Sequence, residues 1–401
     1  MKQGWTYKKL GEVCETLNGL WKGKKPPYVN VGVIRNANFT KDFKLRFDNI
    51  EYLDVEERQY SKRKLQSGDL IIEKSGGSEK QPVGRAVLFE KEEGEFSFSN
   101  FTSVLRIKDK KTLSSKFLFI YLYFIYKRGD TLTMQKATTG IHNIEFEKYL
   151  NIDIPSLPLS EQQRIVSRLD SAFAHIDALK ANAEKQLSDA KALFQKALEK
   201  AMEPKEGWEE KKFKSICKFI RGPFGGSLKK ECFKDSGYAV YEQQNAIYNR
   251  FSFRYFIDEK KYKEMERFSV QTGDLIMSCS GTIGKVAIVP ENAAKGIINQ
   301  ALLKLTPCES IDKYFLKNLM ESSFFEKLIQ ANSDGAAIKN IASVQILKEL
   351  DLYIPTLSEQ QAIVSRLDSL SENVKRLQEV LEKTIKECDA LKQAMLRQVF
   401  E

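Results

Sequence analysis

The chain has 401 residues, a hydrophobic content of 42% and a formal net charge of +10. This length suffices for about two or three domains with packed cores, and the composition excludes a disordered chain. The positive charge favours a polyanionic partner, either a nucleic acid or an anionic membrane surface. The longest apolar run, "FLFIYLYFIY" at 117–126, has about half the length of a membrane-spanning helix, and no apolar secretory signal opens the chain, so we expect a cytoplasmic protein.

Residues 1–155 mix short runs of β-branched and aromatic residues with turn signals such as Pro-Pro and Ser-Gly. The segment "GDLIIE" at 68–73 predicts a strand that is entered from a turn, and "SSKFLFIYLYFIYKR" at 114–128 predicts a helix. This combination predicts a first α+β domain over residues 1–155.

Residues 156–203 predict one long helix. "IPSLPL" favours an extended lead-in, and Ser160 with Gln163 fits a capping box at the helix start. Apolar residues then alternate in steps of 3 and 4 for about five heptads without Gly or Pro, which is typical of a coiled coil rather than of an ordinary core helix. The members of this seam are Ile165, Leu169, Ala172, Ile176, Leu179, Ala183, Gln186, Ala190, Leu193 and Ala197.

The second half of the chain repeats the first in the same order. "GWEEKKFKSIC" at 207–217 echoes "GWTYKKLGEVC" at 4–14, "QTGDLI" at 271–276 echoes "QSGDLI" at 66–71, and "IGKVAI" at 283–288 matches "VGRAVL" at 83–88. A repeat of roughly 200 residues is too long for a solenoid. Residues 204–355 should therefore form a second α+β domain, with a strand in "GDLIMS" at 273–278 and a helix over 312–330.

Residues 356–401 predict a second long helix. "SEQQAIVSRLDS" at 358–369 differs from "SEQQRIVSRLDS" at 160–171 at a single position, and Ser358 with Gln361 offers the same capping box. The predicted helices 160–202 and 358–400 have equal length, and if they pack together they must run antiparallel. The second seam contains Ile363, Leu367, Leu370, Val374, Leu377, Leu381, Thr384, Cys388, Leu391 and Met395.

The predicted fold class is therefore α+β. We expect two α+β domains separated by a long antiparallel two-helix coiled coil with internal pseudo-twofold symmetry. The repeat of one segment at both helix starts needs a reason beyond capping, because any S-x-x-E/Q would cap a helix.

The sequence offers no catalytic site that both halves share. "CSGTIGKV" at 279–286 fails the spacing of a P-loop, G-x-S-x-G is absent, and "KPPY" at 25–28 lacks the amide or acid of an amino-methyltransferase motif. The six cysteines lack CxxC spacing, and of the two histidines, His142 and His175, only His142 lies in a predicted α+β domain. This pattern favours binding over catalysis and predicts neither a cofactor nor a metal site.

Several loops combine cations with Ser, Gly, Asn, Gln and aromatic residues. Ser and Gly allow close approach to phosphate, while Asn and Gln pair with adenine edges and Arg pairs with guanine. Any one of these loops could be an ordinary solvated loop, but their presence in two basic domains favours DNA. The candidate DNA-binding residues are Lys22, Lys24, Lys25, Arg35, Asn36, Asn38, Lys74, Ser75, Lys80 and Arg85 in the first domain, and Arg221, Lys229, Lys230, Gln243, Gln244, Asn245, Ser280, Thr282 and Lys285 in the second.

The whole chain resembles the specificity subunit of type I restriction-modification enzymes. The likeness rests on the twice-occurring "IPxL…SEQQxIVSRLD" segments, the two "GDLI" strands with their Ser-Gly loops, "GTIGKVAIV" at 281–289 and the "GW…KKL/F" openings. It implies that each α+β domain is a target-recognition domain that reads one half of a split, asymmetric DNA target. It also implies that the helices set the gap and dock two methyltransferase subunits, through Glu161, Gln162, Gln163, Arg168, Glu359, Gln360, Gln361 and Arg366.

The resemblance further implies a division of labour. The methyltransferase subunits would bind S-adenosylmethionine and methylate adenine, and a motor-nuclease subunit that uses ATP and magnesium would join them to cleave DNA. This chain itself would carry no catalysis and no cofactor. Two other functions compete with this one: a structural coiled-coil adaptor without DNA contact, which would show no salt-dependent binding to duplexes, and a self-contained DNA-modifying enzyme.

Overall fold

The computed structural model describes residues 2, 4–21, 23–78, 81–138, 140–224, 226–279, 284–331 and 344–401. It divides into two compact units, the first of residues 1–183 with 383–401 and the second of residues 184–382. This division differs from the predicted one, in which each helix is a segment of its own, because each unit contains the beginning of one long helix and the end of the other. We call the α+β part of each unit its head, residues 2–158 in the first and 203–356 in the second.

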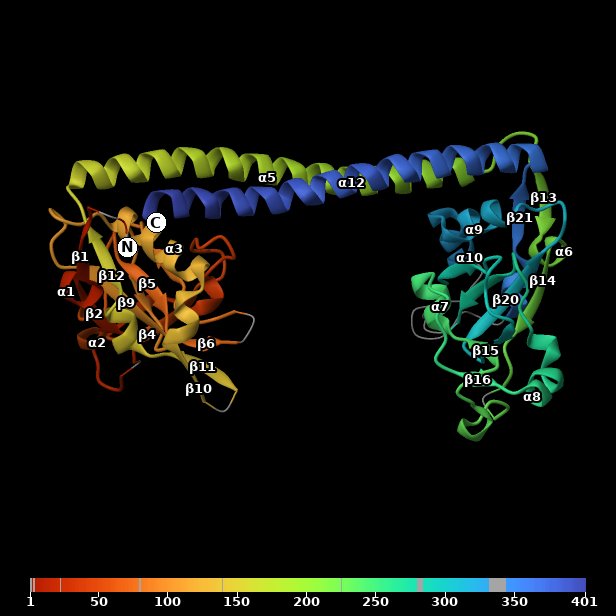
Figure 1. Cartoon of the computed structure of the whole chain (residues 1–401), viewed down its shortest axis with the longest axis horizontal. Helices are drawn as coiled ribbons and strands as arrows, with labels where there is room; N and C mark the ends of the chain where they lie inside the picture. Colours follow the sequence, from red (N-terminus) through yellow and green to blue (C-terminus); the bar gives the residue numbers. More distant parts are fainter. Residues whose placement is uncertain are drawn as a thin grey trace. The chain divides into compact units, whose positions relative to one another are not determined.

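The first head is built around an antiparallel sheet and a mixed sheet (Figure 1), and residues 35–38, 74–77 and 99–101 follow strands at one edge of these sheets. In each sheet, the C-terminal ends of the strands that run towards this edge lie beside the N-terminal ends of the antiparallel strands that run away from it. The loop 99–101 joins β8 (Phe96–Phe98) of the mixed sheet to β9 (Thr102–Ile107) of the antiparallel sheet, so the two edges adjoin. The antiparallel sheet has the order β2 (Cys14–Asn18), β9 (Thr102–Ile107), β5 (Leu70–Glu73) and β7 (Ala86–Leu88), and the mixed sheet has the order β4 (Glu51–Glu56), β3 (Tyr28–Ile34) and β8 (Phe96–Phe98).

Shorter elements complete the first head. They include a pair of strands that joins the two ends of the head and a small sheet beside β5. Their bounds are β1 (Thr6–Lys9) paired with β12 (Asp153–Ser156); β10 (Gln135–Thr138), β11 (Ile141–Ile144) and β6 (Ser75–Gly77) in one sheet; α1 (Leu10–Val13), α2 (Glu57–Ser61), α3 (Ser115–Arg128) and α4 (Phe146–Leu150); and the 3-10 turns η1 (Asn36–Asn38) and η2 (Asp130–Met134).

Helix α3 contains the apolar run of the sequence analysis; it ends at the predicted residue, Arg128, and begins one residue later than predicted, at Ser115. The Ser114 side chain accepts a hydrogen bond from the Phe117 N–H at the start, and Gly129 ends the helix with a left-handed φ of 94°. Most of its apolar residues are buried in the core of the first unit, so this segment is a core helix of the head.

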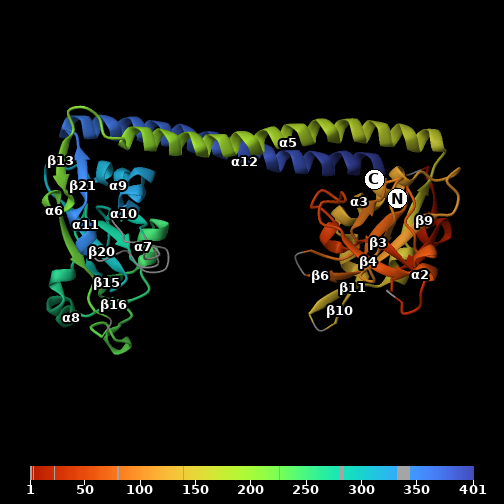
Figure 2. The ribbon, with the colours of Figure 1, turned by 180° about the vertical axis from the view of Figure 1, so that it is seen from behind.

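The second head repeats this plan (Figure 2). Its antiparallel sheet has the order β14 (Cys217–Arg221), β20 (Leu302–Pro307), β17 (Leu275–Ser278) and β18 (Val286–Ile288), its mixed sheet has the order β16 (Phe256–Ile257), β15 (Tyr238–Tyr241) and β19 (Gly296–Ile298), and β13 (Glu209–Lys212) pairs with β21 (Asp351–Ile354). The helices are α6 (Phe213–Ile216), α7 (Gln243–Tyr248), α8 (Glu259–Glu264), α9 (Lys313–Glu321), α10 (Ser323–Ala331) and α11 (Val344–Glu349), with 3-10 turns η3 (Lys230–Cys232) and η4 (Glu266–Phe268). The predicted α+β class is confirmed in both heads.

The single helix predicted over 312–330 is wrong, because the segment forms two helices, α9 and α10. The break lies at Ser322, which is buried and has an extended backbone with ψ of 151°. Its hydroxyl accepts a hydrogen bond from the Phe325 N–H at 3.2 Å and donates one to the Leu319 carbonyl at 2.6 Å. Ser322 thus caps α10, and a serine competes with the helix backbone in this way.

The two long helices are α5 (Leu159–Met202) and α12 (Leu357–Phe400), and both end where the sequence predicts. They begin one residue earlier than predicted, so Ser160 and Ser358 lie inside the first turn and the predicted capping boxes are misplaced. At α12 the cap is Thr356, whose hydroxyl accepts from the Glu359 N–H at 3.3 Å.

A buried glutamine anchors the start of each long helix to its head. Gln162 accepts a hydrogen bond from the Ser114 N–H at 2.9 Å and donates to the carbonyls of Thr112 and Leu157 at 2.9 and 2.8 Å. Gln360 makes the same three bonds, to the N–H of Asp312 and the carbonyls of Ser310 and Pro355, at 2.7, 3.1 and 3.0 Å. Both side chains are 0% exposed, so we correct their expected docking role to a structural one. This anchor supplies a reason for the repeat beyond capping.

The last turn of each long helix belongs to the core of the head at which the other long helix begins. In the first unit, Leu396 and Phe400 of α12 are buried, and the Phe400 ring packs against Phe117, Tyr121 and Phe124 of α3. Figure 1 shows this end of the chain beside α3. In the second unit, Leu198 and Met202 of α5 are buried in a core that includes Trp208 and Phe315.

The two helices run antiparallel in the first unit, as predicted. Lys180 of α5 pairs with Asp389 of α12 at 2.8 Å, and Asp177 of α5 pairs with Lys392, so the numbers rise along one helix as they fall along the other. In the second unit, the end of α5 shares a core with the start of α12, which gives the same direction.

The predicted seam is only half buried. In the first unit Ile176, Ala183 and Cys388 are buried, and in the second unit Ala190, Val374 and Leu381 are buried, at spacings of seven residues within each helix. The other row of the seam reaches solvent: Leu179 and Leu391 of the first unit are 53% and 51% exposed, and Leu193 and Leu377 of the second unit are 55% and 43% exposed. Each unit therefore presents one half-exposed leucine from each helix.

We predict that Phe400→Ala destabilises the first unit by about 3–5 kcal/mol, because it leaves a cavity among the rings of α3. Leu391→Ala, on the same helix but half exposed, should cost less than about 1 kcal/mol. Chemical denaturation followed by circular dichroism measures both. Equal losses for the two variants would contradict the burial of this helix end.

We also predict that Gln162→Ala lowers the free energy of unfolding by roughly 1–3 kcal/mol, because it removes three hydrogen bonds to part-buried backbone groups of the first head. Gln163→Ala is the matched control, since its side chain is exposed and the expected change is within about 0.5 kcal/mol. Thermal unfolding of both variants measures these changes in stability. An unchanged stability of Gln162→Ala would contradict the claim that Gln162 anchors the start of α5 to the first head.

Candidate nucleic-acid interface

Polar segments that lie far apart in the sequence meet at the sheet edge of the first head. The Asn36 side-chain amide donates to the Ser75 carbonyl at 2.5 Å, which joins the turn after β3 to the segment after β5. The Ser99 N–H donates to the Ile34 carbonyl at 2.9 Å, and the N–H groups of Lys74 and Ser75 donate to the Phe101 carbonyl. We call this edge, with residues 35–38, 74–77 and 99–101, the first polar edge.

The second head assembles the equivalent edge through equivalent bonds. The Asn299 N–H donates to the Tyr241 carbonyl at 2.9 Å, and the Cys279 N–H donates to the Ala301 carbonyl at 2.9 Å. Residues 242–245, 278–279, 284–285 and 299–301 form this second polar edge. The structure therefore brings Asn36, Lys74 and Ser75 together in one head, and Gln243, Gln244 and Lys285 onto the matching edge of the other.

Two glycines allow this close assembly. A side chain at Gly19 would place its Cβ 2.0 Å from the Ser99 carbonyl oxygen, and one at Gly222 would place it 1.8 Å from the Asn299 carbonyl oxygen. Only glycine lets the backbone after β2 and after β14 approach so closely.

Two of the candidate base-reading amides prove to be structural. Asn38 is 0% exposed, its oxygen accepts from the Arg35 N–H at 2.8 Å, and its nitrogen donates to the Asn49 carbonyl at 2.9 Å. Asn245 is also 0% exposed, accepts from the Glu242 N–H at 2.7 Å and donates to the Arg250 carbonyl at 2.6 Å. These asparagines fix the turn after β3 and the first turn of α7, so we correct their expected contact with DNA.

The residue that opens each of these turns forms an ion pair. It is the cation of the pair in the first head and the anion in the second. In the first head Arg35 pairs with Glu51 at the start of β4. In the second head Glu242 accepts from Arg254 at 2.9 and 3.0 Å, and these hydrogen bonds raise the pKa of the Arg254 guanidinium. The two edges thus share a backbone scaffold, but the residue that opens the turn is cationic in the first head and anionic in the second.

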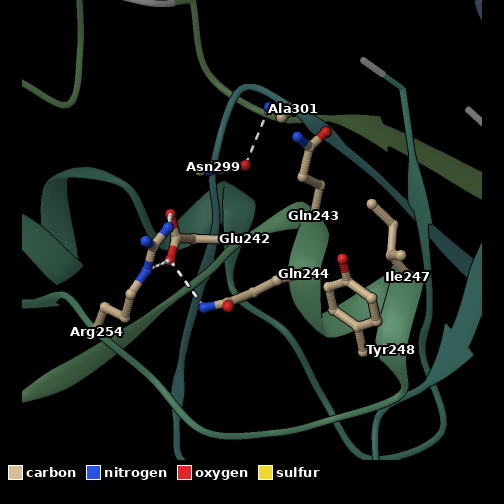
Figure 3. Close-up of a pocket in the computed structure, with 8 residues that line it drawn as sticks. All are labelled: Glu242, Gln243, Gln244, Ile247, Tyr248, Arg254, Asn299 and Ala301. Carbon is tan, nitrogen blue, oxygen red and sulfur yellow. Dashed lines mark hydrogen bonds and ion pairs between the residues drawn. The ribbon is translucent and has the colours of Figure 1, made fainter. Parts of the chain in front are cut away.

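The second polar edge is hollowed into a cavity of about 250 Å³ (Figure 3). The Gln243 side chain extends towards Ala301, and Gln244 donates to Glu242 at 3.2 Å. The wall consists of Glu242, Gln243, Gln244, Ile247, Tyr248, Arg254, Asn299 and Ala301. Carboxylate, guanidinium, amide and aromatic groups in one concave surface are the groups that read base edges and stack on bases.

The loop after β5 in the first head differs from the loop after β17 in the second. Arg85 is 8% exposed and its guanidinium pairs with the Glu73 carboxylate at 2.7 Å, so its expected contact with DNA is corrected to a buried ion pair. At the equivalent place Ser278 replaces the carboxylate: its hydroxyl accepts from the Lys285 N–H at 3.1 Å, and the Lys285 side chain is exposed. A DNA contact of Lys285 stays a prediction.

The remaining candidates are scattered. Lys24 and Lys25 are exposed but precede the start of β3, about 20 Å from its far end, where Asn36 lies. Lys229 and Lys230 likewise precede β15, whereas Gln243 follows it. Arg221, by contrast, is exposed at the end of β14 directly before Gly222, so it lies beside the second polar edge, where burial raises the pKa of the Cys279 thiol and the Arg221 charge lowers it. Lys22, Lys80, Ser280 and Thr282 lie outside the described residues.

Some of the candidate docking residues around the helix starts are exposed, and others bind partners within the chain. Four of them are exposed on the first turns: Gln163, Arg168, Gln361 and Arg366. The two glutamates have partners within the chain. Glu161 pairs with Arg164 at 2.7 Å, and Glu359 accepts from the Trp208 indole at 3.0 Å.

The candidate residues chosen from the sequence lack Tyr248, Arg254 and Asn299, which line the cavity at the second polar edge. Tyr248 is 72% exposed and is the last residue of α7, the short helix that begins with Gln243. A signal for Arg254 is present in "RFSFRYF" at 250–256, where cations alternate with aromatic residues. Asn299 carries no such signal, because only the sheet topology places it beside the turn.

Two kinds of reactive group remain to be placed in the described part of the chain, metal ligands and thiols. Within it, no three His, Cys, Asp or Glu side chains gather in a way that would hold a metal ion. Cys279 at the second polar edge is buried, and burial raises the pKa of its thiol to about 11, so it stays protonated at neutral pH. Among the described helices, none combines the length and apolar content that a membrane crossing needs.

Fold and site together define a duplicated binding protein with two α+β heads, one polar edge on each. The chain matches the family described as the type I restriction modification DNA specificity domain, over residues 2–188 and 205–387. These two matches cover most of the chain and contain both heads. The chain therefore belongs to this family.

Curated relatives align with this chain over its full length, and solved structures share its fold. The specificity subunit of the type I restriction enzyme EcoKI from Escherichia coli K12 is 23% identical, with 100% of this chain and 89% of that protein covered. The StySPI specificity subunit from Salmonella potsdam is also 23% identical at the same coverage. The HsdS subunit from Thermoanaerobacter tengcongensis has the same fold, with a TM-score of 0.63 and 19% identity over 100% of this chain and 97% of that one. A chain of a type I R-M system complex reaches a TM-score of 0.79, also at 19% identity, over 100% and 98% of the two chains.

We predict that Lys285→Ala weakens binding to duplex DNA about equally for all sequences and lowers the slope of log affinity against log salt by about one, because one phosphate contact is lost. Lys260→Ala is the matched control, an exposed lysine of α8 away from the polar edge, and should change neither quantity. Fluorescence anisotropy over a salt series measures both. Loss of preference at one base with an intact slope would overturn this assignment.

Proposed function

We propose that this chain is the DNA-recognition subunit of a type I restriction-modification complex, and that each head reads one half of a split, asymmetric target in double-stranded DNA. The observation that carries the proposal is the polar edge itself, which occurs twice on one backbone scaffold with different side chains. Two identical edges would read a symmetric target. Reversed ion pairs at Arg35 and Glu242 instead suit two different half-sites.

We also propose that the long helices set the gap between the half-sites and dock two methyltransferase subunits. The exposed glutamines and arginines of the helix starts support this proposal, as do the half-exposed leucines. Leu179 and Leu391 in the first unit, and Leu193 and Leu377 in the second, are apolar side chains at equivalent places in the repeat. A partner helix laid along each unit would cover them, which would account for a seam that the chain leaves partly open.

Catalysis belongs to the partners in this proposal. The methyltransferase subunits supply S-adenosylmethionine chemistry, a motor-nuclease subunit supplies ATP- and magnesium-dependent cleavage, and this chain acts in the cytoplasm without a cofactor of its own. The buried thiol of Cys279 and the side chains of the polar edges suit recognition rather than group transfer.

The test is to replace residues 205–355 by the matching head of a related specificity subunit and to map methylated adenines after assembly with methyltransferase subunits. One half-site should change and the other should persist, because each head carries its own polar edge. The reciprocal replacement of residues 1–155 is the control and should change the other half-site. A simultaneous change of both half-sites in either chimaera would contradict independent reading.

A further inference from the structure

Several buried polar atoms at the two polar edges have no hydrogen-bond partner. In the described part of the chain, Arg35 Nε, Asn36 Oδ1 and Ser99 Oγ at the first edge and Gln243 Oε1 at the second lie buried without one. Buried polar groups in native proteins are nearly always paired, because an unpaired one is costly. Four of the eight such atoms in the described part of the chain lie at these two edges, the others being Ser103 Oγ, Thr131 Oγ1, His142 Nδ1 and Ser323 Oγ. The four at the edges are the ones that a ligand approaching the edge could complete.

The two amides occupy the same place in the repeat. Asn36 follows Arg35 and precedes the buried Asn38 by two residues, and Gln243 follows Glu242 and precedes the buried Asn245 by two residues. Both turns are locked by the same asparagine bond to the backbone N–H of the opening residue. An unpaired amide oxygen thus recurs at one position although the side chains differ in length, so the position rather than chance packing decides it.

The amides are fixed in place but able to present their oxygens. Both side chains are partly exposed, and the terminal torsion of Asn and Gln has a broad energy profile, so rotation of the amide would turn the buried oxygen towards solvent, which in Asn36 exchanges the bond to the Ser75 carbonyl for a bond to the ligand. Asn36 is steadied by its bond to the Ser75 carbonyl, and Gln243 is steadied by the wall of the cavity beside Asn299 and Ala301. A donor that enters from solvent would complete either group.

We propose that Asn36 and Gln243 are the equivalent base-reading residues of the two heads, each accepting a hydrogen bond from the exocyclic amino group of an adenine in the major groove. An amide also offers an N–H for adenine N7, so it matches this base with two bonds. This inference rests on the proposed function and deepens it, since it assigns one specificity-determining side chain to each half-site.

The experiment compares Gln243→Met with Asn245→Leu in the full-length chain. Methionine has the shape of glutamine without its polar atoms, and removal of an unpaired buried acceptor should leave the melting temperature unchanged or raised. Asn245→Leu removes an amide whose bonds are all made, so the melting temperature should fall. The exposed Asn292→Leu, in the turn before β19, is the control for an amide outside the edge.

Selection of bound duplexes from a random-sequence library, followed by sequencing, gives the base preference of each variant. Gln243→Met should lose preference for adenine at one position of one half-site by roughly 5- to 150-fold, with all other positions kept. Asn36→Leu should affect one position of the other half-site, and Asn292→Leu should select the wild-type sequence.

Two results would overturn the inference while leaving the proposed function intact: Gln243→Met selects the wild-type sequence at every position, or it lowers the melting temperature as much as Asn245→Leu and so reveals a structural role. A wild-type chain that enriches no sequence at all would instead refute the proposed function, and the base-reading role with it.

Discussion

The exchange of helix ends between the two units is the constraint on which the rest of the chain depends. Helix α12 begins at the second head and ends with Phe400 in the core of the first, and α5 begins at the first head and ends with Met202 in the core of the second. Neither core is complete without a helix that the other head begins. The two helices must therefore match in length, and both have 44 residues.

The helix starts are held as firmly as the ends. Gln162 and Gln360 each satisfy three backbone groups of a head and are fully buried, so the direction in which each long helix leaves its head is fixed by hydrogen bonds that only a glutamine of this reach can make. A side chain with this task must recur in both halves. The duplicated segment is thus explained first by architecture, while its exposed neighbours remain available to partners.

The polar edges differ from the helix starts, because their backbone scaffold is repeated while their side chains are not. Their scaffold is repeated, with Gly19 and Gly222 pressed against a neighbouring loop and with Asn38 and Asn245 locking a turn. The side chains on this scaffold are not repeated. The residue that opens the turn is the cation of an ion pair in the first head, Arg35, and the anion in the second, Glu242. The first head also buries the pair Arg85–Glu73, whereas the residue equivalent to Arg85 in the second head is the exposed Lys285. One rigid frame can in this way carry two chemistries, which suits a subunit that reads two different sequences.

The sequence by itself determined the features that depend on local periodicity and on repetition: the duplication, the α+β class, helix α3, and the ends of both long helices. Tertiary structure alone decided which polar side chain serves structure and which faces solvent. Gln162 and Gln163, or Asn36 and Asn38, look alike in the sequence, and the difference lies in backbone partners as remote as Thr112 and Asn49. Arg85 was expected to contact DNA, but it forms a buried ion pair with Glu73 across a loop. A buried cation needs a paired anion, and only the fold brings this anion to Arg85.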